Sequence, residues 1–249
     1  MDLYYEVKGE GNPVVLLHSG GVDLREWTYI TPLLAEHYKV VTFDARGIGK
    51  SPSPLNQVNY VEDLLSILNH LKLDKATLIG HSIGGQIATE FALNYPERVK
   101  KLVLIGPSLS GFQYSKDYNT FMNTINHAAP DLEKMLELSL NGSLYKIVMT
   151  SINRELMVEM HRLYFERILT WPAFEMVWPQ PTAIDRLEDL SIETLFIIGK
   201  EDFLDNHRVG ECFKRAPKVN FVEIPDADHM LPLTHTEELH HHIINFLKE

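Results

Sequence analysis

A serine flanked by glycines lies in the most informative segment of the chain, between Ala76 and Ala92. Its centre reads Gly80-His81-Ser82-Ile83-Gly84; a short apolar run precedes it, and apolar residues at helical spacing follow it. This order of strand, tight turn and helix suits a nucleophile elbow, in which the serine lies on a strained turn and small residues two positions away relieve crowding. The segment therefore predicts that Ser82 is a nucleophile. The alternative is a serine that only caps the helix.

A serine hydroxyl is a weak nucleophile at neutral pH and needs a base within hydrogen-bond reach. Among the 12 histidines, we select His229, which follows the last predicted strand. It is therefore expected at the carboxyl edge of the sheet, where open α/β sheets bind ligands. The alternative is an ordinary surface histidine. We interpret His81, beside the serine, as a packing residue. His161, His235 and the run at 240–242 are interpreted as solvated positions on helices.

The acid that orients the histidine is expected at the same edge, between the serine and the histidine in the chain. Asp202 follows the apolar run 195–198 by way of a glycine, and we prefer it to its rival Asp205. The loop after the apolar run 102–105 reads Gly106-Pro107 and offers no carboxylate. Asp202 is therefore the predicted acid of a Ser-His-Asp triad.

An acyl-transfer site also needs donors that stabilise a developing oxyanion. The backbone N–H of Ile83, next to the serine, is one candidate. The second candidate is Gly20, within His18-Ser19-Gly20-Gly21, which follows the buried apolar run 14–17. The alternative for this second segment is a simple tight turn.

Strand and helix patterns alternate over most of the chain and predict a mainly parallel sheet with helices on both faces. The segment from Leu24 to His37 is expected to be a helix broken near Pro32. From 108 to about 190 the alternation stops, and only helical periodicity is found. We therefore expect a core domain formed by 1–107 and 191–249, and an all-helical cap formed by 108–190.

Composition limits the classes of partner. The chain has a net charge of −11 with 45% hydrophobic and 23% charged residues, which is typical of a soluble globular protein and disfavours nucleic acid and anionic membrane surfaces. No apolar run approaches the roughly 18 residues of a membrane span. No secretory signal pattern is seen, and the single cysteine, Cys212, is interpreted as a packed thiol. We therefore expect a cytoplasmic protein.

No cofactor or metal is expected. The loop Asp44-Ala45-Arg46-Gly47-Ile48-Gly49-Lys50-Ser51 ends like a phosphate-binding loop, but Asp44 occupies the position of the first glycine. No dinucleotide fingerprint and no spacing of His, Cys and carboxylates typical of a metal site are present.

Taken in order, these motifs resemble the α/β-hydrolase superfamily, specifically its capped esterase and lactonase type. The resemblance covers the chain outside the insertion. It implies the triad Ser82, Asp202 and His229, an oxyanion hole from the amides of Gly20 and Ile83, and a structural role for the loop that begins at Asp44. This chain departs from the family at two positions. Ser19 replaces the usual glycine after His18, which leaves the exact oxyanion donor open. Asp228 replaces a glycine before His229, where a carboxylate would raise the pKa of the histidine.

The resemblance implies a serine hydrolase that cleaves a carboxylic ester, thioester or lactone of a small apolar molecule. Alternatives on the same fold are hydrolysis of a carbon–carbon bond in a dienoic diketone, cofactor-free perhydrolysis, and a non-catalytic receptor for a small ligand. Met157, Trp171 and Met176 in the insertion are candidates for lining an apolar pocket, or else for packing the cap internally. The sequence does not indicate an oligomeric state.

Overall fold

A seven-stranded sheet forms the centre of the protein, with strand order β1-β3-β2-β5-β6-β8-β9. The computed structural model describes residues 1–54 and 56–248. The strands of the sheet are β1 (Tyr5–Lys8), β2 (Pro13–Leu17), β3 (Lys39–Phe43), β5 (Ala76–His81), β6 (Val99–Ile105), β8 (Thr194–Gly199) and β9 (Val219–Ile224). Strand β1 pairs antiparallel with β3, and the other pairings within the sheet are parallel. The expected mainly parallel sheet is therefore confirmed.

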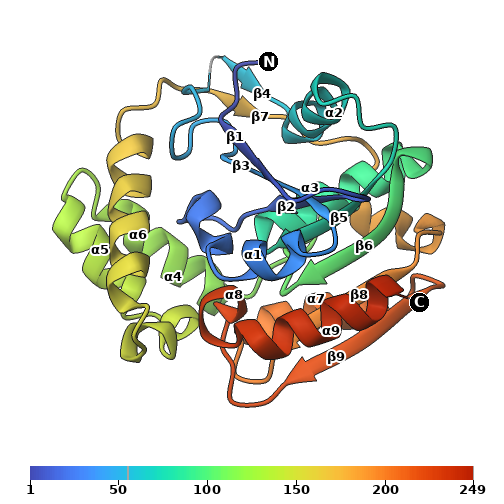
Figure 1. Cartoon of the computed structure of the whole chain (residues 1–249). Helices are drawn as coiled ribbons and strands as arrows, with labels where there is room; N and C mark the ends of the chain where they lie inside the picture. Colours follow the sequence, from blue (N-terminus) through green and yellow to red (C-terminus); the bar gives the residue numbers. More distant parts are fainter. Residues whose placement is uncertain (55, 249) are drawn as a thin grey trace.

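Helices cover both faces of this sheet (Figure 1). They are α1 (Ile30–Ala35), α2 (Tyr60–His70), α3 (Ile83–Asn94), α4 (Lys116–His127), α5 (Leu132–Leu140), α6 (Arg154–Ile168), α7 (Leu204–Phe213), α8 (Leu231–Thr234) and α9 (Thr236–Lys248). The 3-10 helices are η1 (Leu24–Trp27), η2 (Pro96–Arg98), η3 (Ser143–Tyr145), η4 (Val148–Thr150) and η5 (Ala183–Asp189). No helix among the described residues has the length and apolarity needed to cross a membrane.

Alternate residues of β2 show how the two faces are buried. Val15 and Leu17 pack into one apolar cluster with side chains of α2, α3 and α7. Val14 and Leu16 pack into a second cluster with side chains of α1 and α9. Successive side chains of a strand point to opposite faces, so a strand that is apolar throughout fits a sheet covered on both sides.

The helix expected from Leu24 to His37 is divided differently. The chain forms η1, which ends at Trp27, and then α1, which begins at Ile30. The break lies before Pro32, and Pro32 itself lies in the first turn of α1. A proline is tolerated there because the first N–H groups of a helix have no acceptor within the helix. The expected break near Pro32 is therefore present, but it falls at residues 28–29, ahead of the proline, and α1 ends at Ala35 rather than at His37.

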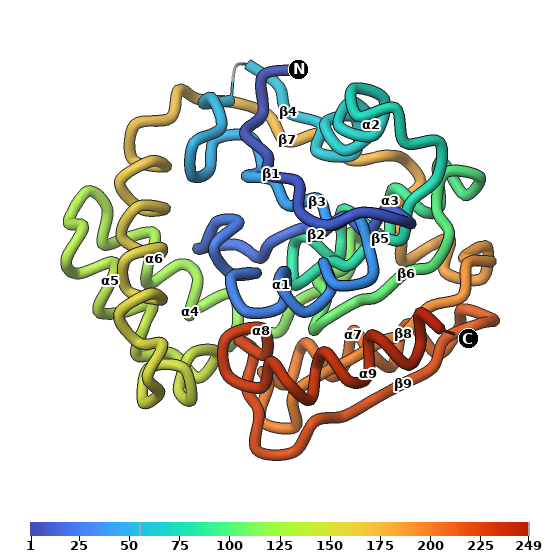
Figure 2. The backbone as a smooth tube through the Cα atoms, viewed as in Figure 1, coloured from blue at the N-terminus to red at the C-terminus, as the bar shows by residue number. Residues whose placement is uncertain are grey.

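The insertion leaves the sheet after β6 and returns at β8 (Figure 2). Its helices α4, α5 and α6 lie together at one side of the sheet in Figure 1 and bury a third apolar cluster, which also includes Val22, Met230 and Leu233 of the core. The insertion is not all-helical as expected, because it also contains non-helical connections and β7 (Glu175–Met176), which pairs in parallel with β4 (Gln57–Val58). Two residues are too few to show a strand period, which explains why the sequence did not predict β7. The boundaries of the cap stay a prediction.

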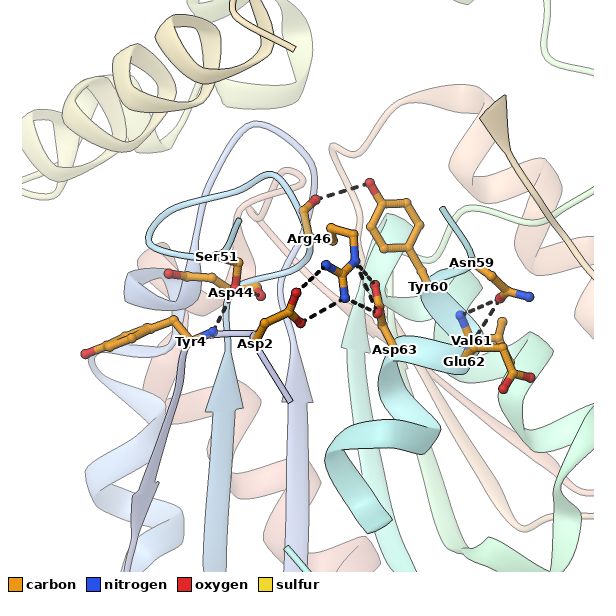
Figure 3. Close-up of polar contacts among 10 residues, drawn as sticks. All are labelled: Asp2, Tyr4, Asp44, Arg46, Ser51, Asn59, Tyr60, Val61, Glu62 and Asp63. Carbon is orange, nitrogen blue, oxygen red and sulfur yellow. Dashed lines mark hydrogen bonds and ion pairs between the residues drawn. The ribbon is translucent and has the colours of Figure 1, made fainter. Parts of the chain in front are cut away.

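The loop after β3 is held by a polar network (Figure 3). Asp44 accepts a hydrogen bond from the N–H of Lys50 at 2.8 Å. The guanidinium of Arg46 pairs with the carboxylates of Asp63 at 2.7 Å and Asp2 at 3.0 Å. These contacts fix the loop to its neighbours, in agreement with the structural role expected for it.

The crossing of α3 over β2 depends on a glycine. A Cβ atom at Gly84 would lie 2.2 Å from the carbonyl oxygen of Leu17, which is backbone and cannot move aside. We expect Gly84→Ala to lower the free energy of unfolding by about 1–3 kcal/mol, measured by urea denaturation. Gly20→Ala is the control, because the nearest atom to its Cβ would be 3.9 Å away. Equal stability of Gly84→Ala and the parent would contradict this reading of the packing.

Candidate active site

The predicted nucleophile lies on a strained turn between β5 and α3. Ser82 has φ 52° and ψ −117°, a conformation that non-glycine residues rarely adopt. Its N–H donates to the carbonyl of Ile105 at 3.0 Å, and its own carbonyl accepts from the N–H of Ser108 at 3.0 Å. A Cβ at Gly80 would lie 2.4 Å from the carbonyl oxygen of Gly84. The glycines two positions before and after the serine are therefore required by the turn, and Ser82 faces a cavity.

The predicted base and acid form a buried pair at the carboxyl ends of β8 and β9. Nδ1 of His229 lies 2.9 Å from Oδ2 of Asp202, and both side chains are buried. The other oxygen of Asp202 accepts hydrogen bonds from the N–H of Phe203 at 2.7 Å and the amide of Asn206 at 2.8 Å. Burial alone would raise the pKa of Asp202, but His229 and these donors lower it. Burial alone would lower the pKa of His229, but Asp202 raises it. The carboxylate is thus ionised and suited to orient the imidazole.

Asp205, the rival acid, points elsewhere. Its carboxylate accepts hydrogen bonds from the N–H and hydroxyl of Ser115 and pairs with Arg208 at 2.7 Å. It therefore joins the start of α4 to α7. The loop after β6 leaves room for the pair of Asp202 and His229. A Cβ at Gly106 in this loop would lie 2.8 Å from Oδ2 of Asp202. A carboxylate after β8 and a glycine after β6 are thus complementary features of one site.

A cavity of about 330 Å³ lies between the insertion and the carboxyl edge of the sheet. Ser82 and His229 line it, and so do Gly20 and Ile83, the two predicted oxyanion donors. None of the described residues that line it is Asp, Glu, Lys or Arg. Within 1–54 and 56–248, no three His, Cys, Asp or Glu side chains converge on a possible metal position. The arrangement is suited to a neutral organic ligand.

A second buried carboxylate, which sequence reasoning missed, holds the loop after β2. Glu26 accepts hydrogen bonds from the N–H and the hydroxyl of Ser19, each at 2.9 Å, and lies 2.6 Å from Nδ1 of His81. It is fully buried. Burial would raise the pKa of Glu26, but His81 and Ser19 outweigh it and lower the pKa. The serine in place of the family's usual glycine thus anchors the Gly20 loop. The sequence did contain a signal for this role, because Glu26 is a charged residue that lies directly before Trp27 and close to the apolar start of α1.

His81 has a larger part than packing alone. It joins Glu26 to the turn that carries Ser82, and its ring centroid lies 4.6 Å from that of His229. The carboxylate of Glu26 is near enough to contribute to the raised pKa of His229, as is that of Asp228. Asp228 also accepts hydrogen bonds from the N–H groups of Ile147 and Met230, so it ties the insertion to the histidine loop.

Two predictions about α6 need correction. Met157, expected at the pocket, is fully buried in the third apolar cluster and does not line the cavity. His161, expected to be solvated, is only 1% exposed and lines the cavity, and burial lowers its pKa to about 4. His161 lies four residues from both Met157 and Phe165, and this stripe of helical spacing was the missed signal. Trp171 and Met176 line the cavity as expected; Met176 is 43% exposed.

The sequence profile of the α/β hydrolase fold family matches residues 12–236. The chain belongs to this family. It is 28% identical over 210 residues to 2-hydroxy-6-oxo-2,4-heptadienoate hydrolase of Pseudomonas putida, across 78% of this chain and 73% of that protein. It is 28% identical over 244 residues to pimeloyl-(acyl-carrier protein) methyl ester esterase of Legionella pneumophila, across 95% of both chains. A thermophilic esterase from Thermogutta terrifontis shares the fold, with a TM-score of 0.79 and 23% identity over 99% of this chain and 93% of that one.

In this α/β hydrolase, activity should require neutral His229. Because Asp202 holds the pKa of His229 above its usual value, kcat/KM should fall as the pH drops through that raised pKa. Asp202→Asn should move this acid limb to lower pH and reduce kcat by about 10²–10⁴-fold, since the imidazole loses its orienting anion. Asp205→Asn is the matched control and should lose less than about tenfold. The assay is the pH profile of hydrolysis of an activated acetyl ester. A reversed order of the two losses would make Asp205 the acid.

Glu26→Gln keeps the shape of the side chain and removes its charge. We expect kcat to fall by about 10–10²-fold, because the Gly20 loop and the elbow lose a shared anchor, and the acid limb to move to lower pH. Glu10→Gln, an exposed change before β2 at the opposite edge of the sheet, is the control for net charge. An unchanged pH profile and unchanged kcat in folded Glu26→Gln would show that the buried carboxylate has no part in the site.

Proposed function

We propose that the protein is a serine hydrolase that cleaves a carboxylic ester, thioester or lactone of a small, uncharged substrate. The observation that carries this proposal is a serine on a positive-φ turn that lines the same cavity as His229, a buried histidine paired with Asp202. In this proposal Ser82 is the nucleophile and His229 the base, and Asp202 fixes the imidazole tautomer and stabilises its charge.

The proposed oxyanion hole consists of the backbone N–H groups of Gly20 and Ile83. Ile83 is the first residue of α3, so its N–H has no acceptor within the helix, and the helix dipole favours negative charge at that end. Gly20 follows Ser19, whose contacts with Glu26 hold the loop. Donors fixed in advance on backbone stabilise an oxyanion without reorganising during the reaction.

The reaction would then proceed in two halves. The hydroxyl of Ser82 attacks the scissile carbonyl carbon while Nε2 of His229 takes its proton. The tetrahedral intermediate collapses to an acyl-enzyme as His229 protonates the departing alcohol or thiol. A water molecule, deprotonated by His229, attacks the acyl-enzyme, and the acid leaves as Ser82 regains its proton.

The character of the cavity supports a neutral substrate with apolar parts. Carboxylate ligands are usually held by Arg or Lys, and neither occurs among the described residues that line the cavity. The buried carboxylates of Asp202 and Glu26 nearby would repel an anion. We propose that Trp171 and Met176 form part of the apolar wall, and that residues 108–190 act as the cap that excludes water.

Carbon–carbon bond hydrolysis is the second candidate, because the Pseudomonas putida relative is named as a heptadienoate hydrolase. The same triad chemistry would serve it. The name of that relative's substrate specifies a carboxylate, however, for which this cavity offers no cation among its described lining residues. Ester cleavage is therefore the first proposal. The single cysteine, Cys212, suits a reducing compartment, and we propose the cytoplasm as the place of action.

A fluorophosphonate tests the nucleophile. It should add once to the parent protein, and the modified peptide should contain Ser82. Ser82→Ala should neither label nor hydrolyse acetyl esters, while Ser108→Ala, which changes another serine of the same cavity, should label like the parent. Intact-mass spectrometry gives the stoichiometry. Labelling that persists in folded Ser82→Ala would refute the assignment.

A further inference from the structure

Three tyrosines of the insertion line the cavity that holds Ser82. Tyr118 comes from α4, Tyr145 from η3 and Tyr164 from α6. None of their hydroxyls forms a hydrogen bond with a residue that the structure describes. The hydroxyl oxygens are also absent from the enclosed polar atoms that lack a partner, so these unpaired oxygens are not fully enclosed, and the residues that carry them line the cavity. Polar groups inside proteins are usually paired, and three in one cavity without a partner need an explanation.

These hydroxyls belong to one cluster. The ring centroid of His161 lies 5.0 Å from that of Tyr145 and 6.3 Å from that of Tyr164. Tyr118 and Tyr164 are both near enough to Tyr145 to influence its ionisation. Nε2 of His161 is paired with the hydroxyl of Ser139 at 2.9 Å. The insertion thus presents hydrogen-bonding groups from α4, α5, η3 and α6 to the same cavity.

The cluster acts as a set of uncharged donors. Burial raises the pKa of Tyr118 to about 12, and burial likewise raises the pKa of Tyr145 and of Tyr164. All three phenols therefore keep their protons at neutral pH. The carboxylates of Glu26 and Asp202 add to the raised pKa of Tyr145. The same negative field that keeps this phenol protonated disfavours an anionic ligand.

The need to fill space in the cavity does not explain why these three residues are tyrosines rather than phenylalanines. Phe121 and Phe165 line the same cavity from α4 and α6, so phenylalanine is accommodated in the cap side of the cavity. A tyrosine in such a place exposes a polar group that phenylalanine would not. Water is the natural partner for a hydroxyl that no protein group satisfies, and a ligand that displaces such water must replace its hydrogen bonds to bind well.

We propose that Tyr118, Tyr145 and Tyr164 form a subsite that recognises a second, uncharged oxygen acceptor of the substrate, remote from the scissile carbonyl. This inference rests on the proposed ester hydrolysis and names the substrate class more closely. The substrate is a neutral ester, thioester or lactone that carries an additional ether, keto or ester oxygen. The apolar wall receives its hydrocarbon part, and the phenols donate hydrogen bonds to the added oxygen.

Isosteric substrates in which oxygen replaces one methylene test the proposal. On the acyl side the pair is butyl hexanoate and butyl 4-methoxybutanoate. On the alcohol side the pair is butyl hexanoate and 2-methoxyethyl hexanoate. In at least one pair, the parent enzyme should have a higher kcat/KM for the member with the added ether oxygen. Tyr118→Phe, Tyr145→Phe and Tyr164→Phe remove the donors and little else, and at least one of them should lower that preference by about three- to tenfold.

Tyr95→Phe is the matched control. Its hydroxyl donates to Glu62 at 2.7 Å and does not line the cavity, so this variant should keep the parent's ratios. If all three cavity variants fold and keep the parent's ratios within twofold for both pairs, the tyrosines serve shape alone and the proposal is wrong. The proposal is also wrong if the parent enzyme has a lower kcat/KM for both methoxy esters than for butyl hexanoate and the tyrosine variants reduce that difference.

Two further measurements separate this proposal from the proposed function. Fluorophosphonate labelling and acetyl ester hydrolysis report on Ser82 alone, so their presence with unchanged ratios refutes only the subsite. Calorimetry with hexanamide and 4-methoxybutanamide on parent and Tyr145→Phe repeats the comparison without turnover. Tighter binding of the methoxy amide to the parent, lost in the variant, would support the subsite even if ester hydrolysis were absent. Equal binding of the two amides to the parent, together with no preference for 2-methoxyethyl hexanoate over butyl hexanoate, would overturn it.

Discussion

The strained turn at Ser82 is the constraint on which the rest of the structure depends. A positive φ at a serine is unfavourable by itself and persists only when its surroundings hold it. Here β5 is paired on both sides in the sheet, α3 begins directly after the turn, and the carbonyl of Ile105 accepts the serine N–H. Gly84 lets α3 approach the end of β2 closely, which brings the Gly20 loop next to the turn. The packing of one helix on one strand therefore places the predicted nucleophile and both candidate oxyanion donors in one cavity.

Two buried carboxylates lie behind this cavity and act on different parts of it. Asp202 contacts His229 directly, whereas Glu26 contacts His81 and the loop that carries Gly20. Both carboxylates are ionised, because the histidines and hydrogen-bond donors around them outweigh the effect of burial on their pKa values. The negative field that results raises the pKa of His229 and that of Tyr145, so it favours a protonated imidazole and a neutral phenol. In the proposed reaction it would also disfavour anionic substrates, so the same charges that would assist catalysis would help to select the ligand.

The comparisons establish the family and the fold but not the substrate. The family profile and the esterase from Thermogutta terrifontis match the chain across almost its whole length, in accordance with a common fold. The curated relatives have names that refer to different reactions, an ester hydrolysis and a dienoate hydrolysis, at the same 28% identity. Family membership therefore does not select the substrate, and the side chains of the cap have to be considered individually.

Sequence alone determined the elements that depend on neighbours in the chain. The elbow, the glycine loop after β2 and the carboxylate after β8 could each be located, because strands ending in glycine-rich turns have short-range signatures and parallel strands present their carboxyl ends at one edge.

Tertiary structure decided what depends on distant residues or on helix orientation. Glu26 meets His81 across 55 positions, β4 pairs with β7 across more than 100, and Asp205 is engaged by Ser115 of the insertion. Met157 turns into the cap interior while His161, four residues later, reaches the cavity. Hydrophobic spacing gives the buried stripe of a helix but not the partner that buries each part of it, and that partner is set by packing between segments far apart in the chain.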